Sequence, residues 1–319
     1  MTQKNYRIKN FPISFFAVSM GLTGLVISLQ KASVLININK LIIINFLYID
    51  LLIFTILSLI YLNKFVKFKN EVKKEFNNPI KINFFPSFSI SLILFSISFL
   101  DINLEISKYF WLTGTILHLF FTLSIISAWI QKQTFKIQHM NPSWFIPAVG
   151  NILIPIAGIY HFSPEISWFF FSVGLILWLI LMVIFFNRIF FHDPLPEKLL
   201  PTLFILIAPP AIGFISYYKI VNEINDFAKI LYFFALFISI LIFFQAKIFK
   251  NIKYYLSWWA YSFPIASISI ASFIMYQVNK ITLYKYLHFF FLLFLIILVL
   301  FLSYKTIKQA LKRKICVEE

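Results

Sequence analysis

The stretch SWWAYSFPIASISIAS, residues 257–272, is apolar enough to cross a membrane, but it carries a proline at its centre and a series of small residues. A proline inside a helix removes one backbone hydrogen bond and displaces the carbonyl group four residues earlier. In lipid, such a break is tolerated where protein or a water-filled cavity satisfies the freed groups. The stretch therefore predicts a helix in the interior of a membrane protein.

The composition of the whole chain indicates the same class. Of 319 residues, 61% are hydrophobic and 13% are charged, and the mean hydropathy is +0.86. A chain of this kind has too little polar surface to coat a soluble globule. Apolar runs close to the length that a bilayer requires predict ten transmembrane helices in an all-α fold. The runs are residues 13–29, 41–62, 84–100, 109–130, 144–161, 166–187, 201–219, 226–246, 257–277 and 283–305.

We interpret residues 1–319 as a single transmembrane domain, with a short N-terminal segment at 1–12 and a basic tail at 306–319. Most of the 28 Lys and Arg residues lie in the two termini and in the loops on the same side. Because cytoplasmic loops retain positive charge, both termini are predicted to be cytoplasmic in a cell (inner or plasma) membrane. The net charge of +16 then reflects topology and contact with anionic lipid rather than nucleic-acid binding.

The prolines predict how the helices are arranged. All 13 lie in odd-numbered runs or in loops, and five of the seven glycines are in odd-numbered runs as well. The simplest arrangement is five helical hairpins, with the odd helices inside around a central pore and the even helices outside against lipid. Alternatively, the prolines only shape a packed bundle. The glycines and prolines concerned are Gly21, Gly24, Gly150, Gly158, Gly213, Pro86, Pro147, Pro155, Pro209, Pro210 and Pro264.

A helical wheel of the ninth run adds a candidate for a special role. Ser262, Ala266 and Ser269 share one arc, and Phe263 lies between it and a second arc of small residues. A phenylalanine flanked by small residues can project into space that they leave open. The alternative is a core or lipid-facing residue, since the chain has 42 phenylalanines.

Five segments in order resemble one family. SWWAYSFPIAS at 257–267 resembles the ninth-helix motif of the tellurite-resistance/C4-dicarboxylate transporter family, which includes bacterial tellurite-resistance channels and plant guard-cell slow anion channels. Four further segments, all in or entering odd-numbered runs, are similar to its other signatures. They are FPISFFAVSMGLTGL at 11–25, NPIKINFFPSFSI at 78–90, NPSWFIPAVGN at 141–151 and IAPPAIGFISY at 207–217.

The resemblance implies ten helices in five hairpins, a pore closed midway by the phenylalanine that corresponds to Phe263, and a homotrimer with one pore in each subunit. It implies small inorganic anions or dicarboxylates as the transported partners. We therefore expect a phenylalanine-gated channel for small monovalent anions. The alternative is a proton-coupled transporter of C4-dicarboxylates, or an efflux carrier for sulfite, tellurite or small toxic compounds.

The remaining site candidates follow from this expectation. Hydroxyl groups such as those of Ser262 and Ser267 can donate hydrogen bonds to an anion, and Lys81 is a candidate basic residue at a pore mouth, unless it is a lysine whose side chain extends to the lipid surface. The residues expected to line the pore or bend its helices are Gly21, Pro147, Gly150, Pro155, Pro209, Ser262, Pro264 and Ser267.

Two ionisable residues fall inside predicted spans. Asp50 is expected to be protonated or hydrogen-bonded in a structural role, with proton coupling as the alternative, and His118 to be a hydrogen-bonded residue between helices. The five histidines show no metal-ligand spacing, and no pair of aspartates shares a span. We therefore expect neither an enzyme, a metal site nor a cofactor.

Overall fold

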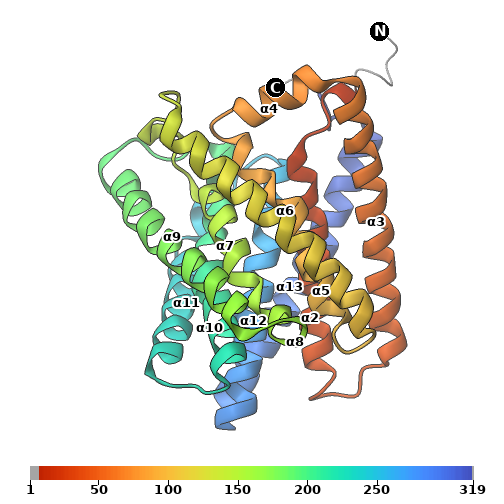
Figure 1. Ribbon diagram of the computed structural model, residues 1–319, viewed down its shortest axis with the longest axis vertical. Helices are drawn as coiled ribbons and strands as arrows, with labels where there is room; N and C mark the ends of the chain where they lie inside the picture. Colours follow the sequence, from red (N-terminus) through yellow and green to blue (C-terminus); the bar gives the residue numbers. More distant parts are fainter. Residues whose placement is uncertain (1–6, 318–319) are drawn as a thin grey trace.

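Residues 7–317 are described in a computed structural model, which is helical throughout its membrane-spanning part (Figure 1). Ten helical segments in this range are long and apolar enough to cross a membrane, which confirms the predicted number. The spans are Ile13–Ala32, Lys40–Lys67, Lys81–Phe99, Leu104–Gln131, Pro142–His161, Pro164–Phe191, Glu197–Val221, Asp226–Phe244, Leu256–Asn279 and Thr282–Leu311.

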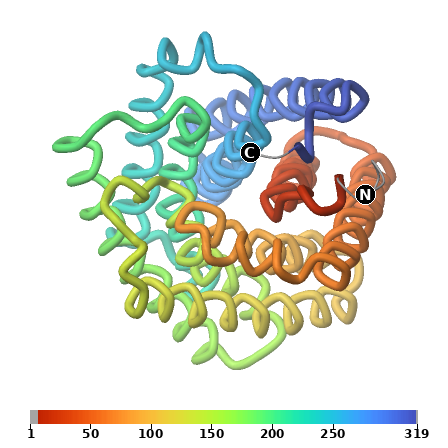
Figure 2. The backbone as a smooth tube through the Cα atoms, turned by 90° about the horizontal axis from the view of Figure 1, so that it is seen from above, coloured from red at the N-terminus to blue at the C-terminus, as the bar shows by residue number. Residues whose placement is uncertain are grey.

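Odd-numbered and even-numbered spans differ in burial. In the apolar section of each odd span 61–94% of the residues are buried, against 28–39% in each even span. Exposed apolar side chains such as Leu52, Val183 and Leu300 lie on even spans, where lipid can cover them. Figure 2, from above, shows the chain passing once around the bundle, and the first and ninth spans pack together.

Each even span is a single long α-helix. These helices are α3 (Lys40–Lys67), α6 (Leu104–Gln131), α9 (Pro164–Phe191), α11 (Asp226–Phe244) and α13 (Thr282–Leu311). Four of the five begin at a residue whose side chain accepts a hydrogen bond from the first turn, namely Asn39, Asn103, Ser163 and Asn225. Such a cap satisfies one of the free N–H groups of a helix start.

Each odd span begins as a 3₁₀-helix and continues as an α-helix. The 3₁₀-helix is the tighter form, with hydrogen bonds three residues apart, and it is common at the ends of α-helices. The pairs are η1 (Ile13–Phe15) with α2 (Phe16–Ala32), η2 (Lys81–Phe84) with α5 (Pro86–Phe99), η4 (Pro142–Phe145) with α7 (Ile146–Leu153) and α8 (Pro155–His161), η5 (Glu197–Ile207) with α10 (Ala208–Val221), and η7 (Leu256–Tyr261) with α12 (Ser262–Asn279).

The prolines explain where the α-helical part of these spans begins. Pro86 and Pro155 are the first residues of α5 and α8, Pro147 and Pro209 are the second residues of α7 and α10, and Pro264 is the third residue of α12. A proline costs little in the first turn, where the N–H group lacks an intrahelical partner in any case. The prolines therefore mark helix starts inside the spans, and Pro264 stands in the first turn of α12, next to the change from 3₁₀- to α-helix within the ninth span.

One proline departs from the predicted distribution. Pro164 is the first residue of α9, which is an even span, so the expectation that even spans contain no proline is wrong by one residue. Pro164 costs little there, because the N–H group that proline lacks has no intrahelical partner in the first turn of a helix.

The start and end of the described chain meet at one end of the bundle, close to α4 (Lys69–Asn77) (Figure 1). Arg7 donates a hydrogen bond to the carbonyl of Ala310, at 3.2 Å. This end also carries a buried ion pair between Lys64 of α3 and Glu75 of α4, with 2.6 Å between Nζ and Oε2.

Backbone groups join this ion pair to the first span. Glu75 accepts a hydrogen bond from the N–H of Ile13 at 2.8 Å and one from the hydroxyl of Tyr61 at 3.1 Å. Lys64 also donates to the carbonyl of Phe11 at 2.8 Å. The pair thereby holds the start of the first span against α3 and α4.

Candidate functional site

Two cavities lie among the odd spans, and Phe263 lines both. We call the smaller one, of about 40 Å³, the first-turn cavity, because it includes a residue from the first turn of five α-helices. These residues are Ala17, Ser87, Ile146, Ala208 and Phe263. The larger one, of about 130 Å³, is called the lysine cavity, because Lys31 and Lys219 line it.

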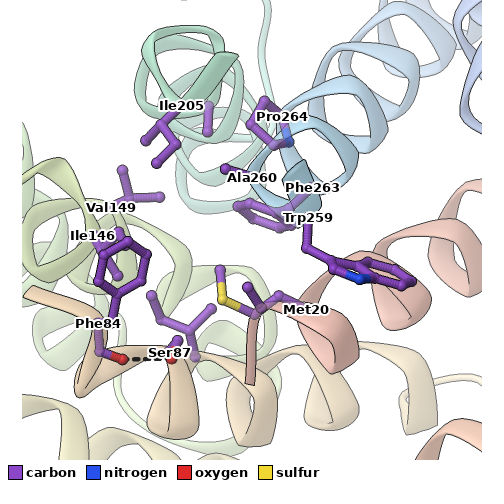
Figure 3. Close-up of a pocket in the computed structure, with 13 residues that line it drawn as sticks. Met20, Phe84, Ser87, Ile146, Val149, Ile205, Trp259, Ala260, Phe263 and Pro264 are labelled. Atoms are coloured by element: carbon purple, nitrogen blue, oxygen red, sulfur yellow. Dashed lines mark hydrogen bonds between the residues drawn. The ribbon is translucent and has the colours of Figure 1, made fainter. Parts of the chain in front are cut away.

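The first-turn cavity is almost entirely apolar (Figure 3). Its one lining hydroxyl, on Ser87, donates to the carbonyl of Phe84 at 2.5 Å, and the indole N–H of Trp259 donates to Thr306 at 2.9 Å. The ring of Phe263 points into this space, which Met20 and Val149 also line. The lining side chains thus offer water or an ion few polar groups.

The lysine cavity is lined mainly by the later parts of the same five spans, with Asp101 and Leu104 from the start of the fourth span and the loop before it. Its apolar residues include Ile27, Leu94, Leu153, Ile212 and Ile270. Its charged side chains are Lys31, Asp101 and Lys219, and the phenol of Tyr160 lies with them. The two cavities therefore differ sharply in polarity, although one aromatic ring belongs to both.

Phe263 is held in place by a close approach of α12 to α2. A Cβ atom added at Gly21 would lie 2.1 Å from Oγ of Ser262, so no larger residue fits without a shift. Ala266 faces Gly24 in the same way, one helical turn further along. Ser262 and Ala266 of the predicted arc thus form a packing surface between α12 and α2.

The predicted hydroxyl donors are already occupied. Ser262 donates to the carbonyl of Trp259 and Ser267 to that of Pro264, each at 2.7 Å. A serine within a helix commonly donates to a carbonyl three or four residues earlier. Neither serine lines a cavity. Both hydroxyl hydrogens are thus engaged by backbone carbonyls, and a role of these serines as donors to an anion stays a prediction.

Gly150 and Pro147 face an even span. The imidazole of His118 on α6 contacts the carbonyl of Pro147 through Nε2 and the hydroxyl of Ser89 through Nδ1, both at 3.0 Å. A Cβ atom at Gly150 would lie 1.9 Å from Cε1 of this ring. The prediction that His118 is a hydrogen-bonded residue between helices is confirmed.

Asp50 is buried on α3, with 1% of its surface exposed. Its carboxyl group contacts the hydroxyls of Ser19 at 3.0 Å and Thr23 at 2.5 Å, both on α2. The expected hydrogen bonding is confirmed, and it joins an outer helix to an inner one.

The other predicted site residues lie outside the two cavities. Lys81 begins η2, Pro155 begins α8 and Pro209 lies in the first turn of α10, and none of the three lines either cavity. Of the predicted pore residues, Phe263 and Pro264 line the first-turn cavity. A role of Lys81 at a pore mouth stays a prediction.

The sequence analysis missed Lys31, Tyr160 and Lys219. Each lies near the C-terminal end of an odd span, on α2, α8 and α10 respectively. Apart from Lys81, the charges at the ends of spans are interpreted in the sequence only as a signal of topology. A tabulation of polar residues at the ends of the inner spans alone would have identified them.

Comparison with known proteins supports the family resemblance found in the sequence. The family model described as voltage-dependent anion channel matches residues 10–307. The chain is 29% identical over 306 residues to an uncharacterized transporter of Methanocaldococcus jannaschii, which covers 88% of this chain and 90% of the relative. It is 27% identical over 273 residues to the S-type anion channel SLAH2 of Arabidopsis thaliana, and this match covers 82% of this chain and 52% of the relative. It is 24% identical over 278 residues to the tellurite resistance protein TehA homolog of Haemophilus influenzae, and this match covers 84% of this chain and 82% of the relative.

Proposed function

The chain belongs to the voltage-dependent anion channel family, and we propose that it passes small monovalent anions through a central pore that Phe263 closes. The proposal depends chiefly on one observation, that Phe263 lines both the first-turn cavity and the lysine cavity. A residue shared by two cavities along one axis is the natural position for a gate. The two cavities would be the two halves of the pore.

The surroundings of the ring suit a gate that works by excluding water. A narrow apolar constriction is a barrier to ions, because an ion that enters it must lose its hydration shell. The first-turn cavity offers such an ion few polar groups in compensation. Movement of the Phe263 ring would connect the two halves.

The charge distribution favours anions. Because spans alternate in direction, the five odd spans run parallel, and the positive ends of their helix dipoles point toward the same end of the pore. No acidic side chain lines the first-turn cavity, and the lysine cavity has two lysines against one aspartate. The positive helix ends thus face the first-turn cavity, and the lining of the lysine cavity carries a positive formal charge.

The test is the current through purified protein in planar bilayers, with chloride, nitrate, sulfite and malate exchanged one at a time. A channel gives a passive current that reverses at the equilibrium potential of the permeant anion. A proton-coupled C4-dicarboxylate transporter, or an efflux carrier for sulfite, tellurite or small toxic compounds, gives instead a flux that follows an imposed proton gradient. That second result would replace our proposal with the carrier.

We also propose a homotrimer with one pore in each subunit and both termini in the cytoplasm. Native mass spectrometry in mild detergent and in lipid nanodiscs is expected to give a three-subunit species. A monomer under both conditions contradicts the trimer. A reporter that is active only in the cytoplasm, fused after residue 319, tests the orientation independently.

A further inference from the structure

We propose that Lys31, Tyr160 and Lys219 form a binding site for a small monovalent anion, such as a halide or nitrate, in the lysine cavity. The three residues come from three different inner helices, α2, α8 and α10. The site rests on the proposed function and deepens it, because an anion bound here would occupy the pore between Phe263 and the end of the bundle opposite the termini.

The space and the charges fit such a ligand. The cavity has about 130 Å³, which accommodates a small anion together with some of its water. Two ammonium groups and one carboxylate line it, so its formal charge is positive. Its remaining lining is largely apolar, which keeps the screening of these charges below that of open water.

The single acid does not neutralise the two lysines. Asp101 lies 3.9 Å from Nζ of Lys31, at the limit of an ion pair, and 78% of its side chain is exposed. Such exposed pairs contribute little. Lys31 and Lys219 line the same cavity, so two like charges face one space. An anion between these like charges would relieve their repulsion.

Tyr160 adds a donor of a different kind. Nζ of Lys219 lies 2.9 Å from the phenol oxygen of Tyr160. An ammonium group has hydrogens to donate and no lone pair to accept with, so the phenol oxygen must be the acceptor in this bond. The phenol hydrogen is then left to donate to a ligand or to water, since Tyr160 is 51% exposed and no hydrogen bond from its hydroxyl to another group is found among residues 7–317. Lys219 thus orients a neutral donor beside its own charge.

Asp101 would limit the affinity of this site. Its carboxylate competes with the anion for Lys31, and it lowers the net charge of the lining. Removal of this charge should tighten binding, whereas removal of either lysine should weaken it. Opposite effects of two neighbouring substitutions are hard to obtain from a general loss of folding.

Bromide is the probe for a direct test, because its anomalous scattering locates it in crystals of the purified protein. We expect a bromide within hydrogen-bond distance of Nζ of Lys219 and the phenol oxygen of Tyr160. The site should be retained in Lys219→Arg, which conserves the charge, and lost in Lys31→Met/Lys219→Met. Lys108→Met is the matched control, because Lys108 is exposed at the same end of the bundle and does not line the cavity.

Conductance gives the second measurement, in a variant whose pore conducts, such as Phe263→Ala. In that background Lys219→Met should raise the chloride concentration for half-maximal current by roughly fivefold, and Asp101→Asn should lower it. No bromide in the parent cavity, or bromide that persists in the double variant, overturns the site. Bromide bound in a protein without current would contradict the channel but support the site, so the two failures are distinguishable.

Discussion

Gly24 faces Phe263 across the interface between α2 and α12, since a Cβ atom built at Gly24 would lie 3.6 Å from Cδ2 of the Phe263 ring. The same atom would lie 2.9 Å from the Cβ atom of Ala266, which is closer than two carbon atoms can approach without a shift. Because Gly24 carries only a hydrogen atom as its side chain, α12, which carries Phe263, can lie this close to α2.

Gly24→Ala is expected to move the first turns of α12 away from α2 and to raise the resting anion current. Overpacking of this kind costs roughly 1–3 kcal/mol, so a lower melting temperature should accompany the higher current. The measurements are current per folded protein in bilayers and thermal unfolding in detergent. Gly213→Ala is the control, because its added methyl group would find no atom closer than 3.6 Å. A Gly24→Ala protein that matches its parent in both respects would show that the contact does not position the ring.

Gly150→Ala tests the packing of an inner span on an outer one. The added methyl group would overlap the His118 ring, so the imidazole must leave its contacts with Pro147 and Ser89. We expect destabilisation at the upper end of the roughly 1–3 kcal/mol range for overpacking, measured by thermal unfolding. His118→Ala in the same chain should recover part of the loss, because the two substitutions share one site. If the losses of stability from Gly150→Ala and His118→Ala simply add, the His118 ring is displaced without a cost in free energy.

The helix count could be predicted from the sequence because each span contains an apolar run of bilayer length. The ends of the helices could not be predicted, because helices such as α3 continue beyond the apolar run through Lys64 and Lys67, where the bilayer no longer limits their length. Hydropathy also carries no information about the change from 3₁₀- to α-helix. The prolines in the sequence indicated irregular helices, but the sequence did not show that these prolines stand in the first turns of α-helices.

The site was only partly predictable for a related reason. A helical wheel showed that Ser262 and Ala266 form a small surface, but only the structure shows that Gly21 and Gly24 fill it from α2. Phe263 was identified by its motif and its small neighbours together. Lys31 and Lys219 are far apart in sequence, and their position in one cavity depends on the packing of whole helices.

The ion pair of Lys64 and Glu75 is expected to stabilise the fold only as a complete pair. Both side chains are almost fully buried, so Lys64→Met leaves a carboxylate, and Glu75→Gln leaves an ammonium group, without a counter-charge. Each single substitution should cost about 3–5 kcal/mol, and the double variant should be more stable than either. Thermal unfolding of the four proteins measures the coupling. If the double variant is as unstable as the sum of the singles, the charges do not act as a pair.

Phe263 is the residue for which a gate and a core role predict opposite results. It is buried, with 6% of its surface exposed, and truncation of a phenylalanine that only fills a core costs roughly 3–5 kcal/mol. A gate borders space on both sides, so Phe263→Ala should join the first-turn cavity to the lysine cavity and raise the current, at a smaller loss of stability.

Phe263→Leu completes the test, because leucine keeps part of the bulk and should open the pore only in part. The deciding measurement is anion current per folded protein for the parent, Leu and Ala variants, together with melting temperature and oligomeric state. Phe273→Leu is the matched control, because Phe273 is buried on the same helix and lines neither cavity, so its truncation should lower stability without raising the current. A current that rises from Phe to Leu to Ala at position 263, in stable proteins of unchanged assembly, supports the gate. An unchanged current in all three proteins, or a loss of folded protein without current, would assign Phe263 to the core.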